Sequence, residues 1–484
     1  MVGTGTPASC TEAALDAALD CGPPSGRAPV STCTGGGTIT FNCGPSPITI
    51  TVTSRKALAA DTTLDGAGLV TLDGGGGTGV LGVNADVTVS VAEMTIGNGA
   101  STMIGSGTSG GAILNAGTLT VTACIFSSNT AGSGGAIDSS GSLTVTDSTF
   151  TGNTAVNGTV FNARLATLVL MRSTFTGNST TDGGAIYNAG TLAVGDSTFS
   201  ANSANFGGAI YNSGAVTAYG STFAENSATD GGGISNYGAT FTAINCTFFG
   251  NSALAGGGAF DNTGTATATN CTFAANRADH ASAINNDNNT NGTITLTNCI
   301  VADSAAGSSC DFTGGIPIAD GGNNIDDGTT CGFAGAGCAT PSGASFCATN
   351  ALLDPAGLID NGGPTHTVAL QAGSPAVNAG NEAVCSAPAV NNLDQRGYLR
   401  PGGGAANCSI GAYEFNAHAP ANNPCIGDCD GDRDVTVNEL IILATVALGT
   451  AQPPSCPDGI PTGINVDVSV IIQAIKNAAS GCGA

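Results

Sequence analysis

Five carboxylates near the C-terminus have the residue types and the spacing of a calcium site. Asp428, Asp430, Asp432, Asp434 and Glu439 lie within twelve residues of one another. Calcium loops of this length supply oxygen ligands from positions 1, 3, 5 and 12, with position 7 completing the shell. The apolar run from 440 to 448, which Gly449 ends, has the pattern of a helix that follows such a loop. These five residues are therefore the predicted metal ligands, and Ca²⁺ is the predicted cofactor.

Two features weaken the match to this EF-hand pattern. Arg433 replaces the glycine that normally makes the sharp turn at position 6. A second copy, from Cys456 to Cys482, keeps a helix pattern but has Val470 in the last ligand position, so we expect no second ion there. The alternative for the first loop is an acidic surface turn without a metal.

The rest of the chain offers few residues for catalysis. Enzymes that cut acidic polysaccharides need a basic residue beside carboxylates, and glycosidases need two carboxylates at a set separation. Asp182, Asp230 and Asp279 precede glycine-rich tetrads, where a repeated turn position explains them, and we expect Asp394 with Arg396 or Arg400 to form a structural ion pair. We therefore predict no catalytic residue and no enzyme. A polysaccharide lyase or glycoside hydrolase is the alternative, which a clustered Arg/Lys–Asp face would favour.

An internal repeat determines the secondary structure of most of the chain. A Phe recurs every 24 or 25 residues, and an Asn follows each Phe by three positions. A tetrad such as Gly207-Gly-Ala-Ile210 stands between successive pairs, followed by a second Asn column in which Ser139 is the exception. The Phe column comprises Phe126, Phe150, Phe175, Phe199, Phe223, Phe248 and Phe273. A fixed period of this kind is typical of a solenoid.

The residue types indicate which solenoid this is. Each unit contains short alternating runs of Thr and aliphatic residues bounded by Gly, Asn, Asp and Ser, which predict strands and turns. Three short strands and three bends per unit predict an all-β, right-handed parallel β-helix of eleven or twelve coils. Coils stack about 4.8 Å apart, so the Phe residues should form an interior stack and the Asn residues hydrogen-bonded ladders.

Composition limits the environment and the partners. The chain of 484 residues has 34 acidic against ten basic residues, which excludes a nucleic-acid partner, and it has no apolar stretch long enough for a transmembrane segment. Its 18 cysteines lack zinc-knuckle spacing and predict disulfides in an oxidising compartment. Cys124, Cys246, Cys271 and Cys299 fall in a column that otherwise holds Ser, where we expect stacked buried thiols; cross-links between coils are the alternative.

These patterns predict five regions. They are an N-terminal cap over 1–36 that includes a helix capped by Ser9 with Glu12, the β-helix over 37–305, the last coils and a C-terminal cap over 306–416, a linker over 417–424, and a calcium-binding module over 425–484.

The repeat resembles that of polymorphic membrane protein adhesins and, more broadly, of pectate-lyase-like β-helix proteins. Residues 352–415 are similar to bacterial surface proteins of the choice-of-anchor type, and the last 60 residues resemble a small α-helical EF-hand, dockerin-like domain. The resemblance implies a secreted or cell-surface rod, structural or adhesive, with self-association or another surface protein as the partner of the C-terminal module. Glycans or a host or cell surface are further expected partners, and head-to-tail fibres are the expected assembly.

Overall fold

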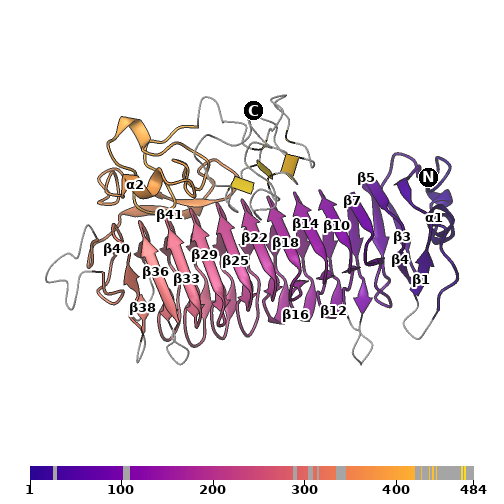
Figure 1. Ribbon diagram of the computed structural model, residues 1–484, viewed down its shortest axis with the longest axis horizontal. Coiled ribbons are helices and arrows are strands. Elements are labelled where there is room, and N and C mark those ends of the chain that lie inside the picture. The colour runs from indigo at the N-terminus through magenta and orange to yellow at the C-terminus, as the bar shows by residue number, and fades with distance from the viewer. Residues whose placement is uncertain are drawn as a thin grey trace.

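The protein is described here by a computed structural model. It covers residues 1–25, 30–101, 109–286, 292–303, 309–312, 316–333 and 345–419, with the isolated residues Gly427, Val435, Glu439, Leu440, Leu443, Val470, Ile471, Ala474 and Ile475. Figure 1 shows a rod of stacked coils with the N-terminus at one end and later segments lying along one side. The chain is a parallel β-solenoid of the right-handed type, as the repeat predicts. No described helix has the length and apolar character needed to cross a membrane.

The first face of the rod is a sheet of twelve parallel strands, which agrees with the predicted number of coils. Its strands are β1 (Val30–Cys33), β4 (Arg55–Leu58), β6 (Leu81–Val83), β9 (Ile113–Asn115), β13 (Ile137–Ser139), β17 (Val160–Asn162), β21 (Ile186–Asn188), β24 (Ile210–Asn212), β28 (Ile234–Asn236), β32 (Phe260–Asn262), β35 (Ile284–Asn286) and β38 (Cys310–Asp311).

The second face is bent, with two strands from most coils. The first stack joins β2 (Gly37–Thr40), β5 (Thr62–Asp73), β7 (Thr88–Gly97), β10 (Thr118–Thr122), β14 (Ser142–Thr146), β18 (Thr167–Met171), β22 (Thr191–Gly195), β25 (Ala215–Tyr219), β29 (Thr240–Ile244), β33 (Thr265–Thr269), β36 (Thr293–Thr297) and β39 (Ala319–Asp320). The second stack joins β3 (Ile48–Thr51), the distal halves of β5 and β7, β11 (Ile125–Ser127), β15 (Thr149–Thr151), β19 (Thr174–Thr176), β23 (Thr198–Ser200), β26 (Thr222–Ala224), β30 (Thr247–Phe249), β34 (Thr272–Ala274), β37 (Ile300–Ala302) and β40 (Ile325–Asp326).

The third face is narrower and interrupted. Four strands pair at its N-terminal end and two further along, namely β8 (Ala100–Ser101), β12 (Thr130–Ser133), β16 (Thr154–Asn157) and β20 (Ser179–Asp182), then β27 (Ser227–Ala228) and β31 (Ser252–Ala253). Isolated bridges such as Ser203 with Ser227 continue the register between them.

The repeated Phe and Asn residues hold the coils together as predicted. Neighbouring rings of the Phe column have centroids 4.3–5.3 Å apart, with Phe199 and Phe223 at 4.9 Å and 5° between planes. Asn202 is fully buried, and its amide donates to the Asn226 side chain at 3.0 Å and to the Phe175 carbonyl at 3.0 Å. Each coil thus satisfies the polar groups of the next without water.

Glycine pairs turn each coil onto the first face. Gly207 has φ +62°, in the left-handed region that favours glycine, and a Cβ on Gly208 would lie 2.2 Å from the Gly232 carbonyl oxygen of the next coil. A side chain on Gly208 would force adjacent coils apart, and one on Gly207 would collide with Ile210 of its own coil.

The N-terminal end is closed by helix α1 (Glu12–Leu19), which follows the 3₁₀ turn η1 (Pro7–Ser9). The predicted Ser9 cap is wrong, because the Thr11 hydroxyl accepts the Ala14 N–H and so caps the helix. Lys56 is buried beneath the helix and pairs with Glu12 at 2.6 Å and Asp16 at 2.7 Å. A charged side chain on the inner side of β4 is therefore neutralised by the element that covers the open end.

The cysteines separate into paired and free groups. Disulfides join Cys10 to Cys43, Cys21 to Cys33, Cys310 to Cys331 and Cys385 to Cys408. The four cysteines of the repeat column, Cys124, Cys246, Cys271 and Cys299, are free and buried. Stacked thiols, the favoured prediction, are therefore confirmed over inter-coil cross-links.

Residues 345–419 lie along the outside of the second face (Figure 1). They contain the antiparallel pair β41 (Leu353–Ile359) and β42 (Thr367–Leu370), the short helix α2 (Glu382–Cys385) and the 3₁₀ turn η3 (Gly402–Gly404). The Gln395 side chain is buried against the coils, where its carbonyl oxygen accepts from Thr247 at 2.6 Å and its amide donates to the Thr222 hydroxyl at 2.9 Å.

Candidate functional site

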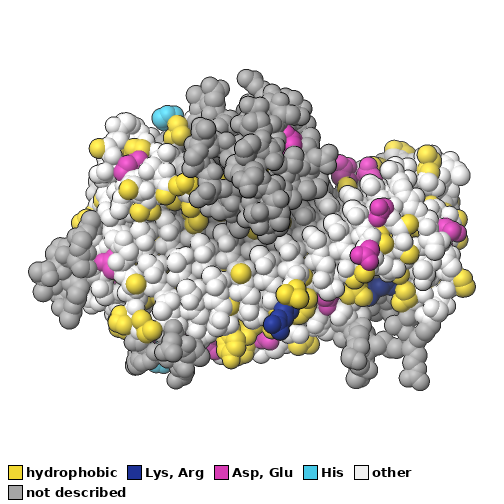
Figure 2. All heavy atoms as spheres, in the orientation of Figure 1, with side chains coloured by type: hydrophobic (Ala, Val, Ile, Leu, Met, Phe, Trp, Pro, Cys, Tyr) yellow, Lys and Arg dark blue, Asp and Glu magenta, His cyan; other side chains and the backbone are white. Residues whose placement is uncertain are grey.

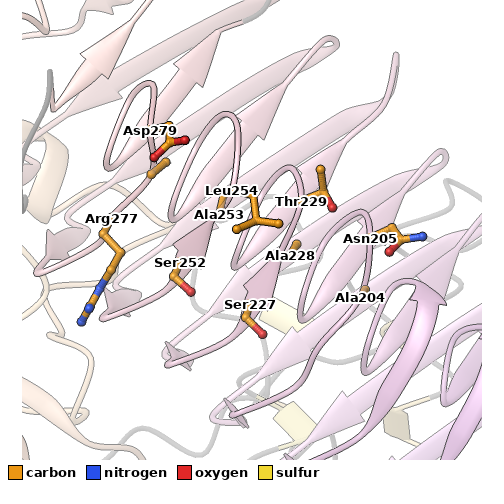
Figure 3. A pocket seen from close by; sticks show the side chains of 11 residues that line it. Ala204, Asn205, Ser227, Ala228, Thr229, Ser252, Ala253, Leu254, Arg277 and Asp279 are labelled. Carbon is orange, nitrogen blue, oxygen red and sulfur yellow. The ribbon is translucent and has the colours of Figure 1, made fainter.

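A groove lies on the third face of the coils. Its volume is about 670 Å³, and it crosses the turns of four successive coils. Figure 3 shows the side chains that line it arranged in rows, one residue of each row per coil. They are Ala204, Asn205, Ser227, Ala228, Thr229, Ser252, Ala253, Leu254, Arg277, Ala278 and Asp279.

The groove exists because one row of the repeat is Ala. Ala204, Ala228, Ala253 and Ala278 succeed one another from coil to coil and form its floor, and the last three are each only 8% exposed. Ser227, Ser252 and Arg277 follow one bank, and Thr229, Leu254 and Asp279 the other. The regular backbone therefore presents a long trough with a floor of Ala and mostly polar banks, in which Leu254, 72% exposed, is the large apolar side chain.

Arg277 and Asp279 are the charged residues at the end of the groove. Arg277 and Asp279 are both exposed, and the hydrogen bonds and ion pairs of the described residues include none between their side chains. The prediction that Asp182, Asp230 and Asp279 share one turn position is wrong for the third residue. Asp182 and Asp230 each form a β-bridge with Phe206 of the coil between them, so these two residues do share a position. In the later coils the bridge joins Gly256 to His280, so His280 and not Asp279 occupies the equivalent position.

The predicted ion pair in residues 345–419 is confirmed, with a different partner for each arginine. Arg396 bonds Asp394 at 2.7 Å, and Arg400 bonds Glu414 at 3.2 Å, with all four side chains nearly inaccessible to solvent. Arg400 also donates to the Ser409 and Gly411 carbonyls. Because every charged group here is already bonded inside the protein, these residues stabilise the fold and are not placed to meet a substrate.

A buried pair at the N-terminal end was not anticipated from the sequence. Arg55 donates to the carbonyls of Ser109 and Gly110, and Asp138 lies close to it on the first face. Burial raises the pKa of Asp138 to about 6, against the lowering effects of Ser109 and Arg55, and burial lowers the pKa of Arg55 to about 10. Spacing could not reveal this pair, because the residues are three coils apart and Arg55 precedes the regular repeat.

The described residues of the C-terminal module pack on the outside of the second face. Ile475 is buried in a cluster with Met171, Tyr219, Ile244 and Val390, and Leu440 and Ile471 pack against the same cluster. Other coils carry Thr at the position of Met171, Tyr219 and Ile244, as at Thr122 and Thr146. We call this cluster of Met171, Ala193, Tyr219, Ile244 and Val390 the flank seat.

The predicted calcium ligands are only partly within the described residues. Asp428, Asp430, Asp432 and Asp434 lie outside them, while Glu439 is described and is 5% exposed. Val435, at position 8 of the predicted loop, is also buried, with 3% of its surface exposed. The calcium site therefore stays a prediction. The described residues contain no cluster of three or more potential metal ligands.

The fold defines the class of protein as a parallel β-solenoid with an aromatic interior stack. Three segments, residues 123–140, 172–189 and 196–213, match the Chlamydia polymorphic membrane protein repeat. Each matched segment contains a Gly-Gly-Ala-Ile-type tetrad or a Phe-x-x-Asn motif of the interior columns, so the match concerns the residues that build the coil. No curated protein and no solved structure matches the chain.

Proposed function

We propose that this chain is a non-enzymatic, secreted or cell-surface rod that adheres to other molecules and supports an extracellular structure. The observation that carries the proposal is the uninterrupted stack of coils with an open groove along the third face. The match to a repeat named for membrane proteins supports a surface location. The paired cysteines at both ends fit an oxidising compartment.

The groove is the proposed contact with a glycan or a cell surface. It crosses several coils and has an Ala on its floor at each of them, which suits an elongated ligand lying along the rod. Binding of the purified protein to a panel of immobilised polysaccharides and cells, compared with Leu254→Asp, tests this contact. This substitution changes one exposed side chain of the groove and no buried group. The proposal requires that it reduce binding by at least fivefold.

Calcium is the proposed cofactor of the C-terminal module, held by Asp428, Asp430, Asp432, Asp434 and Glu439. The ion would supply the charge that gathers these carboxylates into one loop. The burial of Glu439 and Val435 supports this assignment. Isothermal titration with CaCl₂ should give one site per chain.

Self-association through this module is the proposed route to head-to-tail fibres. The described part of the module packs on the flank seat, so a contact with the end of a neighbouring rod requires its departure from that seat. Electron micrographs with Ca²⁺ and with chelator test the proposal. Single rods under both conditions would refute fibre formation. The adhesive role would be unaffected, because the binding assay tests it separately.

The enzymatic alternative is tested separately. Release of unsaturated or reducing ends from pectin-like polymers would show that the chain is a lyase or hydrolase and overturn the non-enzymatic assignment. The buried Arg55 and Asp138 do not support that chemistry, because both side chains are nearly inaccessible to solvent and the Arg55 guanidinium donates to backbone carbonyls.

A further inference from the structure

A ladder of aromatic side chains lies on the outside of the first face, away from the groove rows. Phe161, Tyr187 and Tyr211 occupy one position on β17, β21 and β24, and the register pairs each with the next. Their ring centroids are 5.1 and 4.8 Å apart, and Tyr237 extends the series at 6.2 Å from Tyr211. We call these four residues the outer ladder.

The outer ladder presents ring edges and hydroxyl groups to solvent. Tyr237 is 60% exposed, and Phe161, Tyr187 and Tyr211 are half-buried. Adjacent rings are tilted by 23–35°, and the centroids of Phe161, Tyr187 and Tyr211 follow one another at 5.1 and 4.8 Å, too close for a sugar ring to enter between them. Among the described residues, no protein group forms a hydrogen bond with the hydroxyl of Tyr187, Tyr211 or Tyr237. Three hydroxyl oxygens are therefore free to accept hydrogen bonds from a partner.

A carboxylate accompanies the ladder. Asp182 ends β20, and the chain passes from it through three residues into β21, which carries Tyr187. Burial, followed by the charges of Tyr187, Asp182 and Tyr237, raises the pKa of Tyr211 to about 12. The Asp182 carboxylate makes no hydrogen bond or ion pair among the described residues. Phe206, which is 42% exposed, and Asp230 continue the column of Asp182 along the coils. The surface thus combines apolar ring edges with unpaired acceptors.

Positive charge is scarce around this surface. Of the ten Lys and Arg residues in the chain, Arg55, Lys56, Arg396 and Arg400 are buried and bonded internally. Figure 2 shows few Lys or Arg side chains on the face that it presents. In the coils of the ladder, Arg172 is paired with Asp147 on the second face, which leaves Arg164 on the loop after β17. Among the described residues, no Lys or Arg side chain forms a hydrogen bond or ion pair with the ladder hydroxyls or the Asp182 carboxylate.

We propose that the outer ladder binds an arginine-bearing segment of a partner protein. A guanidinium group has five N–H donors in a planar fork, so it can bond a tyrosine hydroxyl and a carboxylate together, while its alkyl stem packs on ring edges. A glycan is disfavoured because sugars stack on ring faces, and the spacing of these rings leaves no room for a sugar between them. An anionic ligand is disfavoured by Asp182 and by the formal net charge of −24. This binding surface goes beyond the groove of the proposed function and does not depend on it.

The test uses the full chain and three labelled hexapeptides that alternate glycine with arginine, lysine or citrulline. Fluorescence anisotropy in 150 mM salt should give the tightest binding for the arginine peptide, at least fivefold weaker binding for the lysine peptide and none for the citrulline peptide. The double substitution Tyr187→Phe with Tyr211→Phe removes two hydroxyls and keeps the rings. It should weaken binding of the arginine peptide about tenfold.

Charge-matched controls separate the ladder from the acidity of the whole chain. Asp182→Asn should weaken binding several-fold, whereas Asp279→Asn, which removes an equal charge from the groove, should not. Leu254→Asp, the groove variant, should also leave the peptide affinity unchanged. Failure of the groove proposal can therefore be told apart from failure of the ladder proposal. Equal losses for Asp182→Asn and Asp279→Asn, no effect of the tyrosine substitutions, or no binding of the arginine peptide would each overturn the proposal.

Discussion

Replacement of Asn202 by Asp should destabilise the rod strongly, and more at neutral than at acid pH. The Asn202 amide nitrogen donates to the Phe175 carbonyl and to the Asn226 side chain, both at 3.0 Å. Its oxygen accepts from the backbone and side-chain nitrogens of Asn178 at 3.1 and 2.9 Å. Asp has the same shape and keeps the acceptor, but it replaces two donated hydrogen bonds with repulsion between oxygens.

The magnitude follows from those two lost donors. An unsatisfied buried polar group costs about 1–3 kcal/mol, so two facing acceptors give a loss of about 4 kcal/mol at pH 7. Below the pKa of an unfolded Asp, about 3.9, the introduced carboxyl is protonated and can donate one bond, which leaves a loss of about 2 kcal/mol. Burial raises the pKa of this carboxyl in the folded state, so the folded protein binds more protons than the unfolded chain and stability falls as pH rises above about 4.

Urea unfolding followed by circular dichroism at pH 4 and pH 7 measures both effects. Asn205→Asp is the matched control, because Asn205 is three residues further along and exposed in the groove. The reasoning is refuted if Asn202→Asp unfolds at the same urea concentration as the control at pH 7. It is equally refuted if the variant is less destabilised at pH 7 than at pH 4.

The remaining predictions concern the flank seat, the buried acid, the calcium loop and the thiols. Met171→Asp should release the C-terminal module and raise its rate of cleavage by trypsin at least tenfold, while the coils stay resistant. Asp138→Asn should remove a fall in melting temperature that the parent protein shows as pH rises from about 4 to about 6, since the raised pKa of Asp138 makes its folded form favour the proton. Glu439→Gln should weaken Ca²⁺ binding at least tenfold by calorimetry, without change in the circular dichroism of the coils. Cys271 should react with iodoacetamide only after unfolding, because burial raises its pKa and excludes the reagent, as mass spectrometry would show.

The interior of the rod was predictable because each inward residue meets a copy of itself. Phe199 packs on Phe223, and Asn202 bonds Asn226. Residues one period apart in the sequence are therefore in contact in the structure. Ser139 could also be placed in its column before the structure was known, and it accepts the Asn115 amide at 2.9 Å. Spacing carries this information wherever one coil stacks on the next in register.

The outward surfaces were less predictable, because they depend on the coils in which a residue differs from the type found at the same position in neighbouring coils. The low aromatic content suggested few aromatic platforms, yet Tyr187 and Tyr211 recur in the same Ile-Tyr-Asn triplet and could have been found by column. The flank seat had a comparable signal, since Met171 and Ile244 interrupt a run of Thr. The sequence contains no pattern that predicts where residues 345–419 pack. Their contacts, such as that of Gln395 with Thr247, join positions 148 residues apart.

The distribution of the disulfides has a mechanical consequence. Among the described residues, cross-links tie the first turns and the last segments, while the coils from Cys124 to Cys299 contain only free thiols. Under tension between its two ends, the rod should therefore yield in the middle, one coil at a time, as ladders of weak bonds open. Each freed coil of 24 residues would lengthen the chain by roughly 75 Å, so a tether of this design can absorb sudden loads and rewind when they pass.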